Sequence, residues 1–304
     1  MSDGMDQRAK AGSAASDAAR LDPRRNVFRS DLAAESLQGK VNVPRYAQGF
    51  SAQVARAAVP VRRQPILTAG IDTEALLGEI VTVYEERGGW AWVQLSRDKY
   101  VGYVPTDTLM REVEQPTHRV RALGTFVYPA PDIKAPPLVH LSMNARLCVS
   151  KRHEQFCALN NGGFVIARHM AEQGQHERDF VEIAERFIGT PYLWGGRTRI
   201  GLDCSGLVQI ALEAAGFSVP RDADMQQAEI GRYVDIPKEL DELQRGDLVF
   251  WQGHVGIMVD SVMLVHANAH YMMVTAETLP EAVGRVAKSN GKITAIKRLP
   301  DLCA

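Results

Sequence analysis

The segment Leu202-Asp-Cys-Ser-Gly206 decides how the C-terminal part of the chain folds. Asp203 is a good helix N-cap and Gly216 is a typical helix stop, so we expect a helix from Cys204 to about Ala215. A cysteine at the start of a helix meets free backbone N–H groups and the positive end of the helix dipole. Both favour the thiolate and should lower the cysteine pKa. The segment therefore predicts that Cys204 is a reactive nucleophile.

Two histidines follow on predicted neighbouring strands. His254 opens a strand in Gln252-Gly-His-Val255, and His266 ends the next strand. Antiparallel neighbours can place the two rings side by side, so that one faces the thiol and the other holds the ring and tautomer of the first. A helical cysteine or a strand histidine alone is more often structural, but the ordered set favours catalysis.

The region from Glu177 onward has the pattern of an α+β unit. A helical stripe of apolar residues covers Asp179 to Ile188, with Gly189 as its stop. Helices come first and a sheet follows after short connections. The expected strands are Leu248 to Trp251, Val255 to Val259 and Met263 to His266.

The region upstream of Glu177 predicts two small β-barrels. Between Val54 and Met110, short β-branched and aromatic runs alternate with turn residues. A weaker version of the pattern follows from His118 to Ala167, so we interpret the two segments as an internal repeat. The clearest strands of the first barrel are Glu79 to Tyr84, Trp90 to Leu95 and Tyr100 to Val104.

The N-terminal lead has little periodicity. Its Ala-, Ser- and Asp-rich opening predicts poor order over residues 1–52, with a short helix near Asp31 to Gln38. The patterns thus predict two small β-barrels followed by an α+β unit. The domains are expected at 1–52 (lead), 53–114 (first barrel), 115–172 (second barrel) and 175–304 (α+β unit).

Composition excludes several classes of protein. The 304 residues are 45% apolar and 23% charged, which excludes disorder as the main state, and the net charge of −1 argues against nucleic-acid binding. No apolar run reaches the ~18–20 residues that span a bilayer. Met1 to Ala19 has no apolar core of a secretory signal, so we expect a cytoplasmic protein.

No metal or other cofactor is expected. The four cysteines are irregularly spaced and form no C-x-x-C pair, and there is no His-Glu-x-x-His motif. His266 and His270 are four residues apart, but at a strand end this spacing is not a metal signature. A disulfide framework is also not expected in a cytosolic chain of this size.

Residues 179–280 resemble the NlpC-type cysteine peptidases, which cleave bacterial cell-wall peptides and have a papain-like fold. The resemblance implies the fold class α+β, with a papain-like cysteine peptidase domain at 175–304 preceded by two small SH3-like β-barrels. The resemblance implies that Cys204 is the nucleophile, His254 the general base and His266 the residue that orients the base. The matching pieces are Gly189-Thr-Pro-Tyr-Leu-Trp-Gly-Gly196, Asp203-Cys-Ser-Gly206, Arg245-Gly-Asp-Leu-Val249, Gly253-His-Val-Gly256 and His266.

The same resemblance implies roles for neighbouring residues. Tyr192 is expected beside the nucleophile, where it helps to polarise the scissile carbonyl, and Trp194 is expected to line the cleft. Asp203 and Ser205 are expected to contact the peptide. The backbone N–H of Cys204 is expected to hold part of the oxyanion.

Two barrels before the peptidase domain resemble a narrower group, the γ-D-glutamyl-L-diamino acid endopeptidases. In that group the first barrel closes one end of the cleft and admits short peptides with a free N-terminal L-Ala. An acidic residue and a tyrosine anchor the ammonium, because a buried charge needs a partner. Asp203 is the stronger candidate for the acid; the first-barrel candidates are Glu79, Glu85, Trp90 and Tyr103.

The implied reaction is hydrolysis of the γ-D-Glu–diaminopimelate bond in short murein peptides such as L-Ala-γ-D-Glu-mDAP, in the recycling of wall peptides. The alternatives are a wall lysin, an amidase or acyltransferase on the same thiol core, or a catalytically dead binding protein. The preference for diaminopimelate or lysine, the role of the second barrel and the oligomeric state stay open.

Overall fold

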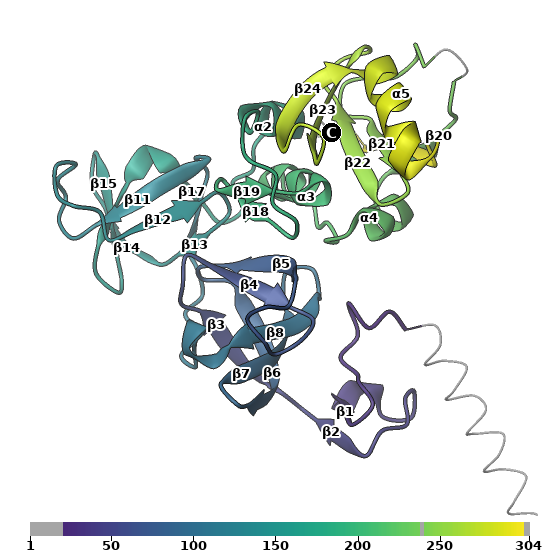
Figure 1. Ribbon diagram of the computed structural model, residues 1–304. Coiled ribbons are helices and arrows are strands. Elements are labelled where there is room, and N and C mark those ends of the chain that lie inside the picture. Colours follow the sequence, from purple (N-terminus) through teal and green to yellow (C-terminus); the bar gives the residue numbers. More distant parts are fainter. Residues whose placement is uncertain (1–20, 238–239, 301–304) are drawn as a thin grey trace, which may run out of the picture.

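The computed structural model describes residues 21–237 and 240–300, which form an N-terminal segment, two β units and a C-terminal α+β unit (Figure 1). No helix in these ranges is long and apolar enough to cross a membrane.

The first β unit is an antiparallel sheet in the order β5-β4-β8-β7-β6-β3-β9. The three strands expected from the sequence are confirmed as β6, β7 and β8. Alternate residues such as Val81, Val83 and Val93 point inward and are fully buried, as the period of two in a strand requires. The strands are β3 (Phe50–Val54), β4 (Ala58–Arg62), β5 (Ile71–Leu76), β6 (Ile80–Arg87), β7 (Trp90–Leu95), β8 (Val101–Pro105) and β9 (Leu109–Met110).

The second β unit contains two antiparallel sheets around a small core that includes Leu141, Cys157 and Val165. The smaller sheet has the order β13-β10-β17 and the larger β12-β11-β16-β15-β14. The strands are β10 (His118–Val120), β11 (Gly124–Tyr128), β12 (Val139–Ser142), β13 (Arg146–Leu147), β14 (Val149–Arg152), β15 (Phe156–Leu159), β16 (Phe164–Ile166) and β17 (Met170–Glu172).

The C-terminal unit is a six-stranded antiparallel sheet, in the order β20-β25-β21-β22-β23-β24, with helices on both faces. Leu248 and Phe250 of β21 pack toward α2 and α3, whereas Val249 and Trp251 pack toward α5. The elements are α2 (Phe180–Arg186), β18 (Arg197–Thr198), β19 (Gly201–Leu202), α3 (Cys204–Ala214), α4 (Ala223–Glu229), β20 (Arg232–Val234), β21 (Leu248–Trp251), β22 (His254–Met258), β23 (Met263–Asn268), β24 (Met273–Thr278), α5 (Leu279–Asn290) and β25 (Ala295–Arg298).

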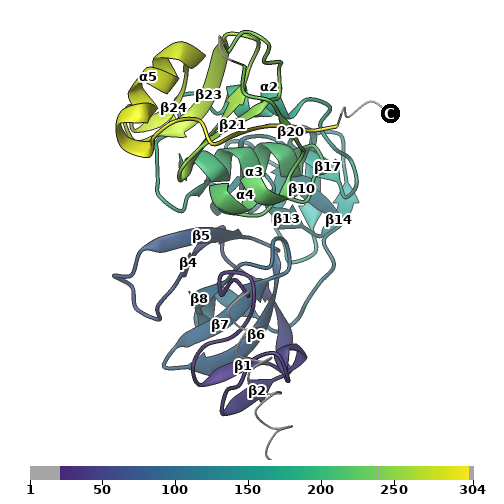
Figure 2. The same cartoon turned by 90° about the vertical axis from the view of Figure 1, so that its right-hand side faces the viewer.

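The helices α3 and α4 lie on the side of this unit that faces β4 and β5 of the first β unit (Figure 2). This placement brings the start of α3 to the boundary between the two units.

The N-terminal segment corrects the expectation of a disordered lead. Residues 1–20 lie outside the described residues, but residues 21–47 form β1 (Leu32–Ala34), a short 3-10 helix (Glu35–Leu37) where a helix was expected, and β2 (Arg45–Ala47). Apolar residues of this segment pack on Trp92 of the first β unit, with the Arg29 guanidinium 4.5 Å from the centre of its ring. The segment is ordered because this surface buries its scattered apolar residues, a contact that local periodicity does not reveal.

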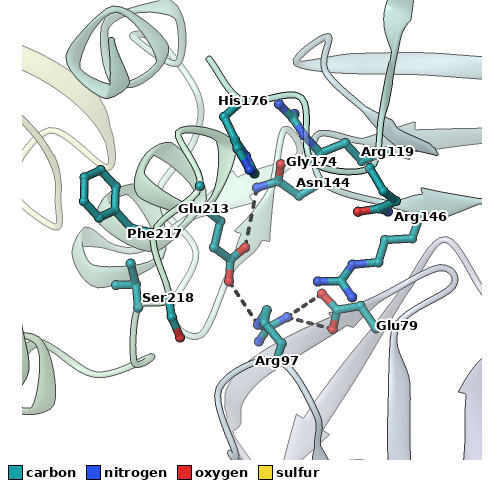
Figure 3. A pocket seen from close by; sticks show the side chains of 13 residues that line it. Glu79, Arg97, Arg119, Asn144, Arg146, Gly174, His176, Glu213, Phe217 and Ser218 are labelled. Carbon is teal, nitrogen blue, oxygen red and sulfur yellow. Dashed lines mark hydrogen bonds and ion pairs between the residues drawn. The ribbon is translucent and has the colours of Figure 1, made fainter. Parts of the chain in front are cut away.

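A buried group of ionised side chains joins the first β unit to α3 and the β18–β19 hairpin. Arg97 donates to both carboxylate oxygens of Glu79 at 2.5 and 2.7 Å, and Arg197 donates to Glu79 at 3.0 Å. Figure 3 shows Arg97 between Glu79 and Glu213 at the edge of a pocket of about 260 Å³, where the three folded units meet. Charges removed from water in this way need such partners, so this group holds the units together.

Replacing Glu79 by Gln leaves Arg97 and Arg197 buried without this carboxylate partner. We expect the free energy of unfolding to fall by about 3–5 kcal/mol, the usual range for breaking a buried ion pair. Chemical denaturation followed by circular dichroism measures the change. The matched control is Glu86→Gln, whose more exposed carboxylate pairs with Arg111 and should contribute less than about 1 kcal/mol. Equal small changes in both variants would contradict the structural role of Glu79.

Candidate active site

Cys204 is the first residue of α3, as the sequence predicts. Asp203 is the N-cap, and its carboxylate accepts hydrogen bonds from the Gly206 N–H at 2.7 Å and the Gly195 N–H at 2.8 Å. The second bond fixes the turn before β18 against the helix start. Gly195 has a φ of +76°, and a Cβ there would lie 2.4 Å from the backbone oxygen of Ile71 in β5, so this turn needs glycine.

His254 and His266 lie side by side, as expected. His254 begins β22, and its Nε2 lies 2.8 Å from Nδ1 of His266 on β23. Both rings are buried, and their centres are 5.0 Å apart. The Val255 N–H, next to His254 in the chain, favours the Cys204 thiolate and thus lowers the pKa of the thiol.

The acid–base state of the pair differs from the sequence-based expectation. Burial and the adjacent Asp203 carboxylate raise the pKa of the Cys204 thiol to about 12, because they outweigh the N–H groups of Val255 and Ser205. Burial and the neighbouring His266 lower the pKa of His254 to about 3. The resting pair is therefore a neutral thiol and a neutral imidazole. A thiolate forms only when the sulfur proton moves to a base, and Nδ1 is the ring nitrogen of His254 that is not engaged by His266.

A pocket of about 310 Å³ opens beside Cys204. Four residues expected at the site from the sequence, Tyr192, Trp194, Asp203 and Ser205, line it together with Cys204. Tyr192 is half-buried, and burial raises its pKa, whereas Trp194 is 66% exposed. The remaining lining residues come from several parts of the chain: Arg24, Arg63, Asp72, Tyr100, Asp222, Ala223, Asp224 and Gly253.

The first-barrel candidates named from the sequence do not line this pocket. Glu79 lies in the buried ion group at the unit junction, and Tyr103 lies with Glu85 and Trp90 in a separate pocket of about 420 Å³. In that pocket Arg29 of the N-terminal segment donates to the Tyr103 hydroxyl at 3.0 Å and pairs with Glu85. The expectation was wrong because chain position alone does not reveal which face of the barrel meets the peptidase unit.

The residues that the first β unit does contribute are Arg63, directly after β4, Asp72, on β5, and Tyr100, just before β8. Tyr100 donates from its hydroxyl to Asp222 at 3.2 Å, and burial raises the pKa of Asp222. Asp72 pairs with Arg63. Tyr100 stood within a predicted strand, but β5, which carries Asp72, was not predicted, since its run Ile71–Leu76 contains two acidic residues.

Arg221 is a buried residue of the site that sequence reasoning missed. Its guanidinium donates to Asp203 at 2.7 Å, to the Ser205 hydroxyl at 2.8 Å and to the Thr73 hydroxyl of β5 at 2.9 Å. Arg221 thus joins the start of α3 to the first β unit. Its place two residues before α4 carries no sequence signal for this role.

Arg24 of the N-terminal segment also reaches the pocket. It donates to Asp222 at 2.9 Å and to Asp224 at 2.7 Å. The lining of the pocket therefore includes charged groups of three chain segments: the N-terminal segment, the first β unit with its Arg63–Asp72 pair, and the start of α4. Among the described residues, no group of three or more His, Cys, Asp or Glu is arranged to hold a metal ion.

The low pKa of His254 predicts that its ring stays neutral when the pH falls from 8 to 5. An ordinary histidine, with a pKa of about 6.5, takes up a proton in that range. The measurement is the pH dependence of the ring ¹⁵N chemical shifts, with the His254→Gln variant used for assignment. A midpoint near 6.5 for His254 would show that burial does not control its protonation.

Two family matches agree with this architecture. Residues 189–285 match the NlpC/P60 family, and residues 61–109 match the bacterial dipeptidyl-peptidase SH3 domain. The first covers Cys204, His254 and His266; the second covers Asp72 and Tyr100.

Relatives of known name resemble the chain over different lengths. Dipeptidyl-peptidase 6 of Lysinibacillus sphaericus is 34% identical over 116 residues, which are 38% of this chain and 41% of that protein. The γ-D-glutamyl-L-lysine dipeptidyl-peptidase of Bacillus subtilis is 29% identical over 236 residues, 70% of this chain and 77% of that protein.

The fold resembles that of a solved NlpC/P60 family protein from Bacillus cereus, with a TM-score of 0.68 at 21% identity over 82% of this chain and 100% of the other. At that identity the likeness concerns the fold. One conclusion follows from the family matches, the cysteine at the start of α3 and the histidines on β22 and β23. The chain carries a cysteine peptidase domain of the NlpC/P60 family behind a bacterial dipeptidyl-peptidase SH3 domain.

Proposed function

We propose that the protein hydrolyses the γ-D-Glu–diamino acid bond of short cell-wall peptides with a free N-terminal L-Ala. The observation that carries the proposal is the composite pocket, which Cys204 lines together with groups from the first β unit, the N-terminal segment and α4. We propose that the groups from these segments close one end of the pocket, so that it accommodates the short end of a peptide and not the middle of a long chain.

The proposed chemistry is acyl transfer to a thiol followed by hydrolysis. The proton of Cys204 moves to Nδ1 of His254 as the sulfur attacks the γ-carbonyl carbon of D-Glu. The backbone N–H of Cys204 and the Tyr192 hydroxyl stabilise the oxyanion. His254 then gives its proton to the departing amine, and afterwards it activates the water that hydrolyses the thioester.

The closed end of the pocket is proposed to bind the substrate ammonium. A cation there needs carboxylate or hydroxyl partners to replace its water. Asp203, beside Cys204, and the hydrogen-bonded pair Tyr100–Asp222 line the pocket and are the proposed partners. Ser205 and Trp194 are proposed to contact the peptide beside the scissile bond.

The relatives bear on the diamino acid at the cleaved bond. Two of them, from Bacillus subtilis and Bacillus cereus, are named γ-D-glutamyl-L-lysine dipeptidyl-peptidases. Both the diaminopimelate and the lysine peptide are therefore substrates to test. A limit to short peptides suits the recycling of fragments released from the wall.

The domain organisation is also part of the proposal. We assign residues 53–114 and 115–172 to two SH3-like domains and 175–304 to the peptidase domain. The five-stranded antiparallel sheet of the second β unit, with its own buried core, supports the second SH3-like assignment.

The first test is mass spectrometry of the products from L-Ala-γ-D-Glu-mDAP, its N-acetylated form and the lysine analogue. We expect release of the free diamino acid from the unblocked peptides, little from the acetylated one, and none with the Cys204→Ala variant. Equal cleavage of the free and acetylated peptides would retain the thiol chemistry but refute recognition of the ammonium. No cleavage of any peptide would refute the proposed substrate.

The second test addresses the closed end of the pocket. Because hydrogen bonds to charged groups contribute ~1.5–3 kcal/mol, Tyr100→Phe and Asp222→Asn should each lower kcat/KM for the free peptide by about 10–100-fold. The matched control is Tyr103→Phe, which removes a hydroxyl on the same unit but outside this pocket, and should leave kcat/KM unchanged. A larger loss with Tyr103→Phe than with Tyr100→Phe would refute the assignment.

A further inference from the structure

We propose that Glu277 of β24 is a positioning residue that sets the tautomers of both histidines and thereby leaves Nδ1 of His254 free to accept the Cys204 proton. This inference rests on the proposed function, because it assigns a task within that thiol chemistry. Glu277 lies outside every motif from which the site was predicted.

The contacts form a continuous polar chain behind the nucleophile. Glu277 Oε1 lies 2.7 Å from Nε2 of His266, and Nδ1 of His266 lies 2.8 Å from Nε2 of His254. Glu277 pairs across the strands with Leu264, so it sits diagonally opposite His266 on the same face of the sheet. Both side chains are buried, with His266 only 1% exposed.

The charge of Glu277 decides the direction of the hydrogen bonds. Although burial favours its neutral form, hydrogen bonds from His266 and Arg285 hold the pKa of Glu277 below its usual value. The carboxylate is thus ionised and can only accept. Nε2 of His266 must therefore carry the hydrogen that is donated to Glu277.

The hydrogen on Nε2 of His266 fixes the positions of the hydrogens on the other ring nitrogens. Burial lowers the pKa of His266, so this ring carries one proton, on Nε2, and its Nδ1 is an acceptor. Nε2 of His254 must then be the donor to that Nδ1. In the neutral His254 ring this leaves the lone pair on Nδ1, which is the form a general base needs.

Arg285 of α5 keeps Glu277 in place. It forms an ion pair with the same Glu277 oxygen that contacts His266, and its guanidinium lies 5.4 Å from the centre of the Tyr271 ring. The Arg285 Nη2 is 3.5 Å from Nε2 of His266, a much longer approach than that of Glu277. The groups that face His266 are therefore His254, Glu277 and Arg285, and Glu277 is the one anion among them.

Loss of Glu277 removes the acceptor that fixes the positions of the hydrogens on the two rings. His266 then carries its hydrogen on either nitrogen, and a hydrogen on Nδ1 reverses the bond to His254. The hydrogen of His254 would move to Nδ1, where it blocks transfer from the thiol. An incorrect histidine tautomer is known to reduce turnover strongly in triad enzymes.

The experiment combines kinetics with ¹⁵N NMR of the histidine rings in the full chain. The variants are Glu277→Leu, which removes the acceptor, and Glu277→Gln, which retains an acceptor oxygen of similar shape. The matched control is Glu281→Gln, since Glu281 contacts Thr278 in the first turn of α5 and not His266.

We expect Glu277→Leu to lower kcat by about 10–100-fold with little change in KM, Glu277→Gln to lose less, and Glu281→Gln to behave as wild type. In the NMR spectra, wild type should show His254 protonated on Nε2, and Glu277→Leu should show a mixture. Thermal unfolding checks that each variant is folded. If Glu277→Leu does not fold, the inference is tested by kcat and by the histidine tautomers of the Glu277→Gln variant.

Wild-type kcat together with unchanged tautomers in the folded Glu277 variants would overturn the inference. The NMR reading needs no substrate, so it also works in a Cys204→Ala background. If the peptides are not cleaved by the wild-type protein, the proposed function fails, while the tautomer assignment is still tested by the spectra.

Discussion

The buried ion pair between Asp203 and Arg221 is the interaction on which the rest of the site depends. Asp203 caps the helix that presents Cys204 and also fixes the turn at Gly195. Arg221 neutralises that carboxylate and extends to Thr73 of the first β unit. Because neither charge can be left alone in a buried place, the helix start, the turn and the first β unit must assemble together. The position of Cys204 and the wall of its pocket thus depend on the same buried ion pair.

This assembly explains why the pocket is composite. The peptidase unit supplies the thiol and the histidines, whereas Asp72, Tyr100 and Arg24 come from segments that precede it in the chain. The N-terminal segment is held on Trp92 and reaches α4 through Arg24. The segments that precede the peptidase unit therefore shape the pocket, while the thiol and the two histidines belong to α3 and the sheet.

Burial also determines the acid–base character of the site. The helix dipole and the N–H groups at the start of α3 favour a thiolate, but burial and the Asp203 carboxylate outweigh them. The result is a neutral thiol and a neutral His254, so in the proposed reaction the proton moves during the attack of the sulfur instead of before it. Such a site depends on the orientation of the ring that accepts the proton. The hydrogen bonds from His254 to His266 and from His266 to Glu277 hold that ring in place.

The sequence by itself determined the helix at Cys204, its Asp203 cap, the paired histidines and the β-strands of the first unit, because caps, turn residues and periodicity act over a few neighbouring residues. Only the tertiary structure decided that Tyr100 and Asp72 line the pocket while Tyr103 and Glu79 do not. It also decided that residues 21–47 are ordered. The supporting contacts of Arg221 with Asp203 and of Glu277 with His266 were likewise visible only in the folded chain. These assignments depend on which faces of separate units meet and on the burial that results. Contacts between residues more than a hundred positions apart, such as Thr73 with Arg221, leave no local pattern in the chain.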